Sequence, residues 1–135
     1  MPLKIGDHAS RTKTITDADI RAFAQASGDT NPIHLDETFA ATTRFGRRIA
    51  HGMLTASLIS AVLGNDLPGT GTIYLSQSMS FKAPVFLDDT ITARVEVIAY
   101  REDKRIATFK TTCTNQDGVV VLEGEAMAIA PKENS

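Results

Sequence analysis

The chain has 135 residues, of which 42% are hydrophobic and 22% charged, proportions that fit one globular domain over residues 1–135. A formal net charge of −2 argues against a nucleic-acid partner, and the N-terminal residues contain no apolar run that could serve as a signal peptide. The single cysteine, Cys113, excludes an internal disulfide framework; it favours a reducing cytoplasm and a role as a small buried side chain.

The first third of the chain predicts one strand followed by helical segments. Residues 9–15 are mostly β-branched or polar, which favours a strand. Thr16 is the expected N-cap of a helix that ends at Ser27-Gly28. Apolar residues at helical spacing give this helix its buried stripe, namely Ile20, Phe23 and Ala24.

An irregular segment is expected after this helix. Pro32 disfavours helix for Asn31 and favours an extended or turned path, so Asp29 and His34 should stand on a loop. A second short helix is predicted over 38–43.

The central feature of the sequence is the uncharged stretch from Gly52 to Gly64. Its apolar residues cover every face and are interrupted only by small hydroxyl side chains, so a helix here should be buried on all sides. The segment is too short for a bilayer, which needs about 20 apolar residues. A buried strand is the alternative, but the length and the Met, Leu and Ala content favour helix.

From Thr72 onward the hydrophobic pattern changes to period two. It predicts four strands joined by short turns, over residues 72–81, 91–98, 106–113 and 119–129. Together with the first strand they make a five-stranded antiparallel sheet. The order of elements indicates an α+β protein of the hot-dog architecture, a sheet curled around a central apolar helix.

Asp29 and His34 are the best candidates for acid–base chemistry. A carboxylate and an imidazole on a loop can together hold and deprotonate a water. The alternative is local structure, with Asp29 capping a turn and His34 bonded to a backbone carbonyl. Gly52 is a further candidate, because the first N–H groups of a helix lack partners and suit a developing oxyanion; a plain helix start is its alternative. His51 could line the same place or only pack.

Several basic side chains stand on this acidic chain, and most should be solvated. Some of them could hold the phosphates of a charged cofactor. The sequence has no P-loop, no paired cysteines and no dinucleotide-binding glycine pattern. The basic residues are Arg44, Arg47, Arg48, Lys82, Lys104 and Arg105.

The segment Ser27-Gly-Asp-Thr-Asn-Pro-Ile-His34, with Ala40 six positions on, resembles the MaoC-like hydratase-2 family. Within that family the chain is similar to the short (R)-specific enoyl-CoA hydratases of the PhaJ type. The resemblance covers nearly the whole chain and includes residues 49–53 and 80–85. Two positions depart from the family pattern: Arg48 stands where relatives often have proline, and Asp88 where they often have glycine.

This resemblance implies reversible addition of water to trans-2-enoyl-CoA, giving (R)-3-hydroxyacyl-CoA. It implies Asp29 and His34 as the catalytic dyad and the Gly52 N–H as the donor to the thioester oxygen. Ser60 would be a polar pocket residue, and Asn31 would support the loop. No metal or redox cofactor is implied, since CoA is part of the substrate. Relatives also imply a homodimer with active sites at the subunit boundary, and no membrane partner.

The acyl tail should run along the central helix and the sheet, with Leu63 and Met127 as candidates for the pocket floor or, equally, as ordinary core. Lys82, with Arg44 and Arg47, is a candidate contact for the CoA phosphates. Two other functions remain open: a hot-dog acyl-CoA thioesterase and a non-catalytic acyl-CoA binding module. Polyester monomer supply and fatty-acid oxidation are both compatible pathways.

Overall fold

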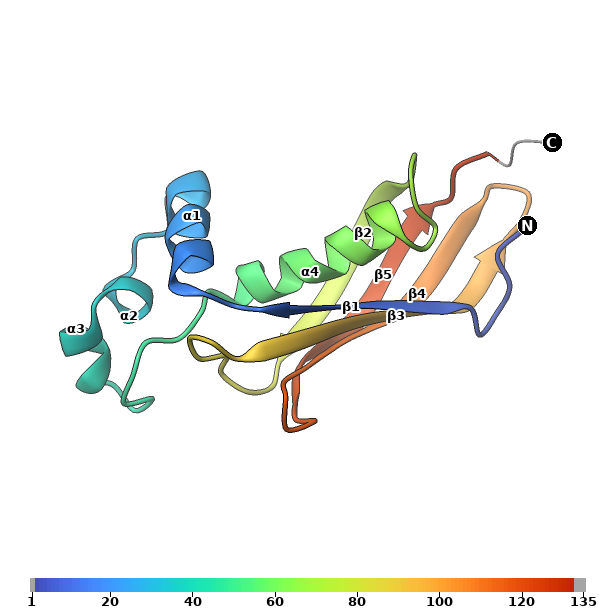
Figure 1. Ribbon diagram of the computed structural model, residues 1–135. Helices are drawn as coiled ribbons and strands as arrows, with labels where there is room; N and C mark the ends of the chain where they lie inside the picture. The colour runs from blue at the N-terminus through green and yellow to red at the C-terminus, as the bar shows by residue number, and fades with distance from the viewer. Residues whose placement is uncertain (1, 133–135) are drawn as a thin grey trace.

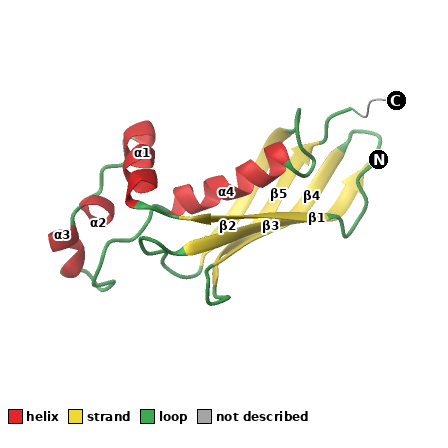
Figure 2. Cartoon of the chain, viewed as in Figure 1, coloured by secondary structure: helices red, strands yellow, loops and turns green. Residues whose placement is uncertain are grey.

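Five antiparallel strands form one sheet in the computed structural model, which describes residues 2–132. The strands are β1 (His8–Thr14), β2 (Ile73–Phe81), β3 (Thr90–Arg101), β4 (Ile106–Thr114) and β5 (Val120–Ile129). Their spatial order is β1-β3-β4-β5-β2, so β1 and β2 are the two outer strands (Figure 1). The helix α4 (Gly52–Asn65) lies along one face of this sheet (Figure 2). The predicted α+β hot-dog architecture is therefore confirmed.

The period-two pattern of the central strands places apolar side chains against α4. β3 buries Ile91, Ala93, Val95 and Val97, as the alternation predicts, and β4 buries Ala107, Phe109, Thr111 and Cys113. The Phe109 side chain is fully buried, and the residue is paired with Val97 on one neighbouring strand and Ala126 on the other. Burial raises the pKa of the Cys113 thiol to about 12, so this side chain stays protonated as a small core residue.

The helix α4 forms where it was predicted, but it is not enclosed on every side. Its buried side includes Leu54, Ile59, Val62 and Leu63. A second side is open to solvent in the protomer, because every third or fourth residue along it is exposed: Met53, Ser57, Ser60 and Gly64. The expectation of burial all round is wrong for this stripe. Within residues 2–132, no helix is long and apolar enough to cross a membrane.

The helix α1 (Asp17–Ser27) begins and ends as its sequence predicts. The Thr16 hydroxyl accepts a hydrogen bond from the Asp19 N–H, and the Asp19 carboxylate accepts one from the Thr16 N–H, which makes a capping box. Gly28 has φ of 79° and closes the helix in the left-handed conformation that glycine favours. Within α1, the side chains of Ile20 and Ala24 are buried.

Two short helices follow, and one of them differs from the prediction. Pro32 begins the helix α2 (Pro32–Leu35), and Asn31 is its N-cap, with a non-helical φ of −53° and ψ of 125°. The effect of proline on Asn31 was predicted correctly, but the helix that starts at the proline was not; His34 therefore lies on a helix rather than on a loop. The helix α3 (Glu37–Ala41) replaces the segment expected at 38–43.

The helices α1, α2 and α3 gather beyond one end of the sheet, next to the N-terminal end of α4 (Figure 1). The segment that enters α4 is tied to the loop after β2. The Ala50 N–H donates to the Val85 carbonyl over 2.7 Å, and Ile49 forms a β-bridge with Phe86. These contacts fix the helical excursion against the sheet at the place where the candidate residues meet.

Candidate active site

A cavity of about 550 Å³ lies beside the N-terminal end of α4. Its walls come from the end of α1, the α2 segment, the first turn of α4 and the end of β2. Six of the candidate site residues from the sequence line it together, namely Asp29, His34, Arg44, His51, Gly52 and Lys82. The topology thus joins residues that are more than 50 positions apart in the chain.

Asp29 is positioned by the turn that follows α1. Its N–H donates to the Ser27 hydroxyl, and its Oδ1 accepts a hydrogen bond from the Asn31 N–H at 3.2 Å. The local role considered for Asp29, capping a turn, is therefore present in the structure. The hydrogen bond from the Asn31 N–H occupies Oδ1 of Asp29 and leaves Oδ2 for other contacts in the cavity.

His34 is buried and has a defined tautomer. Its Nδ1 lies 2.8 Å from the carbonyl oxygen of Ile49, and because a carbonyl only accepts, Nδ1 carries the proton. The neutral ring then presents the lone pair of Nε2. Burial holds the pKa of His34 below its usual value, although the hydrogen bond to Ile49 and the charge of Asp29 act in the opposite direction.

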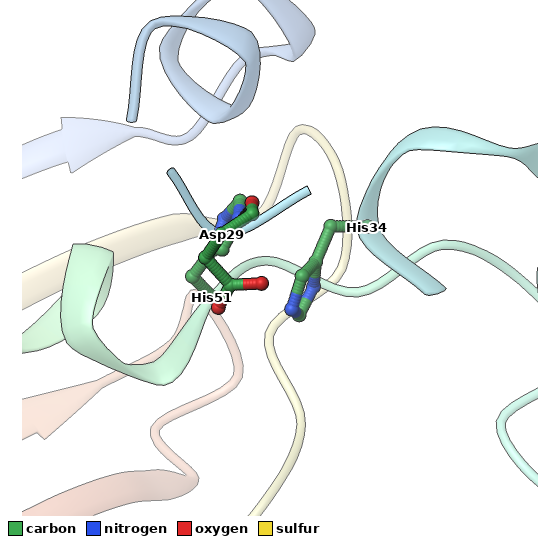
Figure 3. Close-up of side chains that lie close together, drawn as sticks. All are labelled: Asp29, His34 and His51. Atoms are coloured by element: carbon green, nitrogen blue, oxygen red, sulfur yellow. Dashed lines mark hydrogen bonds between the residues drawn. The ribbon is translucent and has the colours of Figure 1, made fainter. Parts of the chain in front are cut away.

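His51 lies against this pair, so of the two roles left open for it, lining the site is the one that the structure shows. Its ring stacks on His34 with the centroids 3.9 Å apart, and its Nε2 donates to the backbone carbonyl of Asp29 at 3.0 Å. One possible ligand atom from each of Asp29, His34 and His51 lies within 4.8 Å of the others, with His51 joining the pair from the segment that enters α4 (Figure 3). This is also a residue set that could hold a metal ion, because each imidazole gives one nitrogen to a backbone carbonyl and keeps the other free.

Two polar atoms in the cavity wall have no partner of their own. In the part of the chain that the structure describes, His51 Nδ1 and the Thr55 hydroxyl are buried without a hydrogen bond. Both residues line the cavity. Because an unpaired buried polar atom is costly, a polar ligand group is the partner that suits this wall. The sequence offered one signal for Thr55, a hydroxyl at i+3 from Gly52.

Gly52 begins α4 and lines the cavity. Its N-cap, His51, makes no side-chain hydrogen bond to the helix, so the first N–H groups of α4 are not capped from that side. A Cβ atom on Gly52 would lie 2.6 Å from a ring carbon of Phe81, so a larger residue here would push the exposed Phe81 ring aside. The helix start therefore brings backbone donors and a partial positive charge to the cavity.

Four other predicted substrate-binding residues lie outside the lining. Leu63 is 1% exposed within the hydrophobic core, so it does not form the pocket floor. Met127 alternates with the buried Ala126 and Ala128 and lies on the opposite face of the sheet, so its assignment to the floor is also wrong. Ser60 lies two turns beyond Gly52 on the exposed stripe of α4. Asn31 supports the loop, as expected, by capping α2 through the Ile33 N–H.

The three basic residues predicted to contact the CoA phosphates are held in different ways, and only Arg44 and Lys82 line the cavity. Lys82 is half exposed, and its Nζ lies 3.5 Å from a carboxylate oxygen of Glu123. The guanidinium of Arg47 lies 3.7 Å from the ring centroid of Phe86, a cation–π contact, and that of Arg44 lies 4.8 Å from the ring centroid of Phe45. Arg44 and Lys82 thus present positive charge at the cavity.

Comparison with known proteins identifies the family. Residues 4–119 match the family model described as "MaoC like domain", and the chain belongs to the MaoC-like family. It is 54% identical to the (R)-specific enoyl-CoA hydratase of Aeromonas caviae over 96% of both chains. It is also 54% identical to the (R)-specific enoyl-CoA hydratase of Rhodospirillum rubrum, over 96% of this chain and 89% of that one.

The fold comparison agrees with the sequence comparison. The solved structure of the (R)-hydratase from A. caviae involved in PHA biosynthesis superposes with a TM-score of 0.93 at 53% identity. The match covers 96% of this chain and 98% of that one.

Proposed function

We propose that this chain is an (R)-specific enoyl-CoA hydratase, which adds water reversibly to trans-2-enoyl-CoA and gives (R)-3-hydroxyacyl-CoA. The observation that carries the proposal is the meeting of the Asp29 carboxylate and a neutral His34 in one cavity at the start of α4. The 54% identity to two hydratases over nearly the full chain supports it.

The chemistry follows from the positions of these groups. Asp29 and His34 bind a water between them; its oxygen adds to C3 of the enoyl group, and a proton is delivered to C2 from the same side. We assign the proton transfers to the dyad as a unit and not to either residue alone. Negative charge that grows on the thioester oxygen is stabilised by the Gly52 N–H at the positive end of α4. The reaction needs no metal or redox cofactor, because CoA is part of the substrate.

The active form is a homodimer with the site at the subunit boundary. An outer strand with unpaired backbone groups needs covering, and the β2 side carries exposed apolar residues that suit this: Ile73, Tyr74, Leu75, Phe81 and Met127. Met53 and Phe81 both line the cavity and are both more than half exposed. The cavity therefore reaches the edge where a second copy would pack.

We place the enzyme in the cytoplasm as one hydratase domain over residues 1–135. The buried, unpaired Cys113 suits a reducing compartment. The (R)-3-hydroxyacyl-CoA product fits either monomer supply for a polyhydroxyalkanoate or fatty-acid oxidation.

The test is incubation of the purified chain with crotonyl-CoA. Hydration removes the conjugated double bond without releasing a thiol, and the product should be the (R) enantiomer. Release of free CoA would instead indicate a thioesterase, an activity for which the helix dipole and an acyl-CoA cavity would be just as suitable. Binding of crotonyl-CoA without turnover would indicate a non-catalytic binding module, and either result would overturn the proposal.

A further inference from the structure

Arg48 is buried although it lies on the loop segment that precedes α4. Its side chain is about 9% exposed, and its guanidinium contacts two other elements. Nε donates to the backbone carbonyl of His34 at 2.7 Å, and Nη2 donates to Oδ1 of Asp17, the first residue of α1, at 2.5 Å. The planar guanidinium of Arg48 therefore links α1, α2 and the entry to α4 through two separate N–H donors. The compact ammonium of a lysine would not reproduce this forked geometry.

The next residue completes a second connection to the same place. The Ile49 N–H donates to the Ile33 carbonyl, and the Ile49 carbonyl accepts the Nδ1 proton of His34. The backbone of His34 is thus held by Arg48 and its ring by Ile49. The helix α2 has only four residues, too few to be stable alone, so its position depends on such tertiary bonds.

The partner of Arg48 is suited to hold it in one place. The contact with Arg48 lowers the pKa of the Asp17 carboxyl, so the pair stays charged at neutral pH. Arg21 contacts the other carboxylate oxygen of Asp17 at 3.0 Å from the exposed side of α1. Arg21 and Arg48 both pair with Asp17, but only the Arg48 guanidinium also donates a hydrogen bond to the His34 carbonyl.

We propose that Arg48 is a positioning residue for His34, which fixes the His34 carbonyl to Asp17 at the start of α1 and so keeps the imidazole within reach of Asp29. This inference rests on the proposed hydratase function. An error of about 1 Å in the place of a reacting group can cost on the order of 100-fold in rate, so the loss of this link should act on turnover more than on substrate binding.

The first test measures kcat and KM for crotonyl-CoA, per folded enzyme, in Arg48→Met, Arg48→Lys and Arg21→Met. Arg48→Met keeps most of the aliphatic volume and should lower kcat roughly 10- to 100-fold, with KM changed less than about threefold. Arg48→Lys should recover only part of the rate, since one ammonium does not reproduce the forked contact. Arg21→Met is the matched control, because it removes the exposed partner of Asp17 and should leave both constants unchanged.

The second test reports on His34 without using activity. Nitrogen-15 NMR of the imidazoles should show one tautomer for His34 in the wild type, with the proton on Nδ1. In Arg48→Met and Arg48→Lys the His34 signals should shift or show exchange between tautomers, whereas Arg21→Met should match the wild type. This measurement keeps its meaning if the protein proves not to hydrate enoyl-CoA.

Each result then decides one question. Wild-type hydration together with unchanged kcat and unchanged His34 signals in Arg48→Met would overturn the positioning role and leave the hydratase function intact. A fall in kcat that only follows the folded fraction would show a purely structural role and would also overturn it. If Arg48→Met does not fold, Arg48→Lys carries the test, and wild-type kcat in that variant would contradict the proposal. Absence of hydration by the wild type would instead reject the proposed function.

Discussion

At the scale of single residues, Asp29 and His34 carry the proposed chemistry. Asp29→Asn and His34→Asn should each lower kcat for crotonyl-CoA by about 10²–10⁴-fold, because each removes a positioned acid–base group. The double variant should be little worse than either single one, since the two groups act as a unit. Circular dichroism should show an unchanged fold. Near-normal turnover in either folded variant would contradict the assignment.

The protonation of His34 sets a second expectation, on pH. Burial lowers its pKa from 6.5, so the neutral ring needed to accept a proton persists below that pH. We expect kcat/KM to hold its neutral-pH value down to about pH 6.5 and to fall only as the pH drops further. Stability should decline in the same range, because the unfolded chain, with the higher histidine pKa, takes up the proton first.

The measurement is kcat/KM from pH 5 to pH 8, with urea unfolding at the same pH values. His8→Gln is the matched control, because His8 lies on the outer strand β1 and outside the cavity lining, and its loss should leave the acidic limb in place. An acidic limb centred above pH 6.5 would show that His34 does not control it.

Three basic residues, of which Arg44 and Lys82 line the cavity, should recognise the nucleotide part of CoA. Arg44→Ala, Arg47→Ala and Lys82→Ala should each raise KM for crotonyl-CoA by about two- to fivefold, with a smaller effect on crotonyl-pantetheine, because half-exposed charge contacts are worth at most about 1 kcal/mol. The effect should shrink at high salt. Lys104→Ala, in the turn between β3 and β4, is the control. Equal effects on both substrates at all three positions would remove this role.

At the scale of elements, α4 has one side in the core and one side open. Leu63 belongs to the core side, so Leu63→Ala should lower the free energy of unfolding by about 2–5 kcal/mol. Because Leu63 does not line the cavity, the ratio of kcat/KM for octenoyl-CoA to that for crotonyl-CoA should stay as in the wild type. Urea unfolding and the two kinetic assays check this. A ratio that shifts toward octenoyl-CoA would return Leu63 to the pocket floor.

The elements that the sequence predicts well are those with a sustained period. The alternation through β3 and β4 separates their residues correctly into a buried and a more exposed set, and the uncharged stretch from Gly52 identifies α4. The helix α2 could not be found this way, because four residues are about one turn and show no period. Proline also gives two opposite signals, against helix for Asn31 and for the first position of a helix at Pro32.

The candidate site was predictable only in part, for a related reason. Asp29 and His34 belong to one local segment, whose motif the sequence displays directly. The contacts of His51 and Arg48 with them cross from a segment at least 14 positions away, and spacing alone does not encode such contacts. Met127 was misplaced because alternation shows that two faces exist but not which one faces α4; Ala126 and Ala128, both small, gave little indication.

At the scale of the whole molecule, we expect a dimer formed through the β2 side. Leu75→Lys places a charge on that outer strand and should raise the dissociation constant of the dimer, with a parallel loss of hydratase activity on dilution. Val119→Lys is the matched control, because Val119 is equally exposed, at 47%, but lies outside β2, in the turn before β5. Light scattering should give about twice the 14.5 kDa chain mass for the wild type. A fully active monomer would contradict the dimer.

The order of elements along the chain also bears on how the protein is made. The helix α4 leaves the ribosome before any of the four strands β2 to β5 that will cover it, and β1 waits for β3, since Thr14 pairs with Thr90. The nascent chain therefore carries an apolar helix with no sheet to pack against until at least residue 90 has emerged. Exposed apolar surface of this kind invites aggregation and chaperone binding. In this fold the segment that organises the core is thus also the part most in need of protection during synthesis.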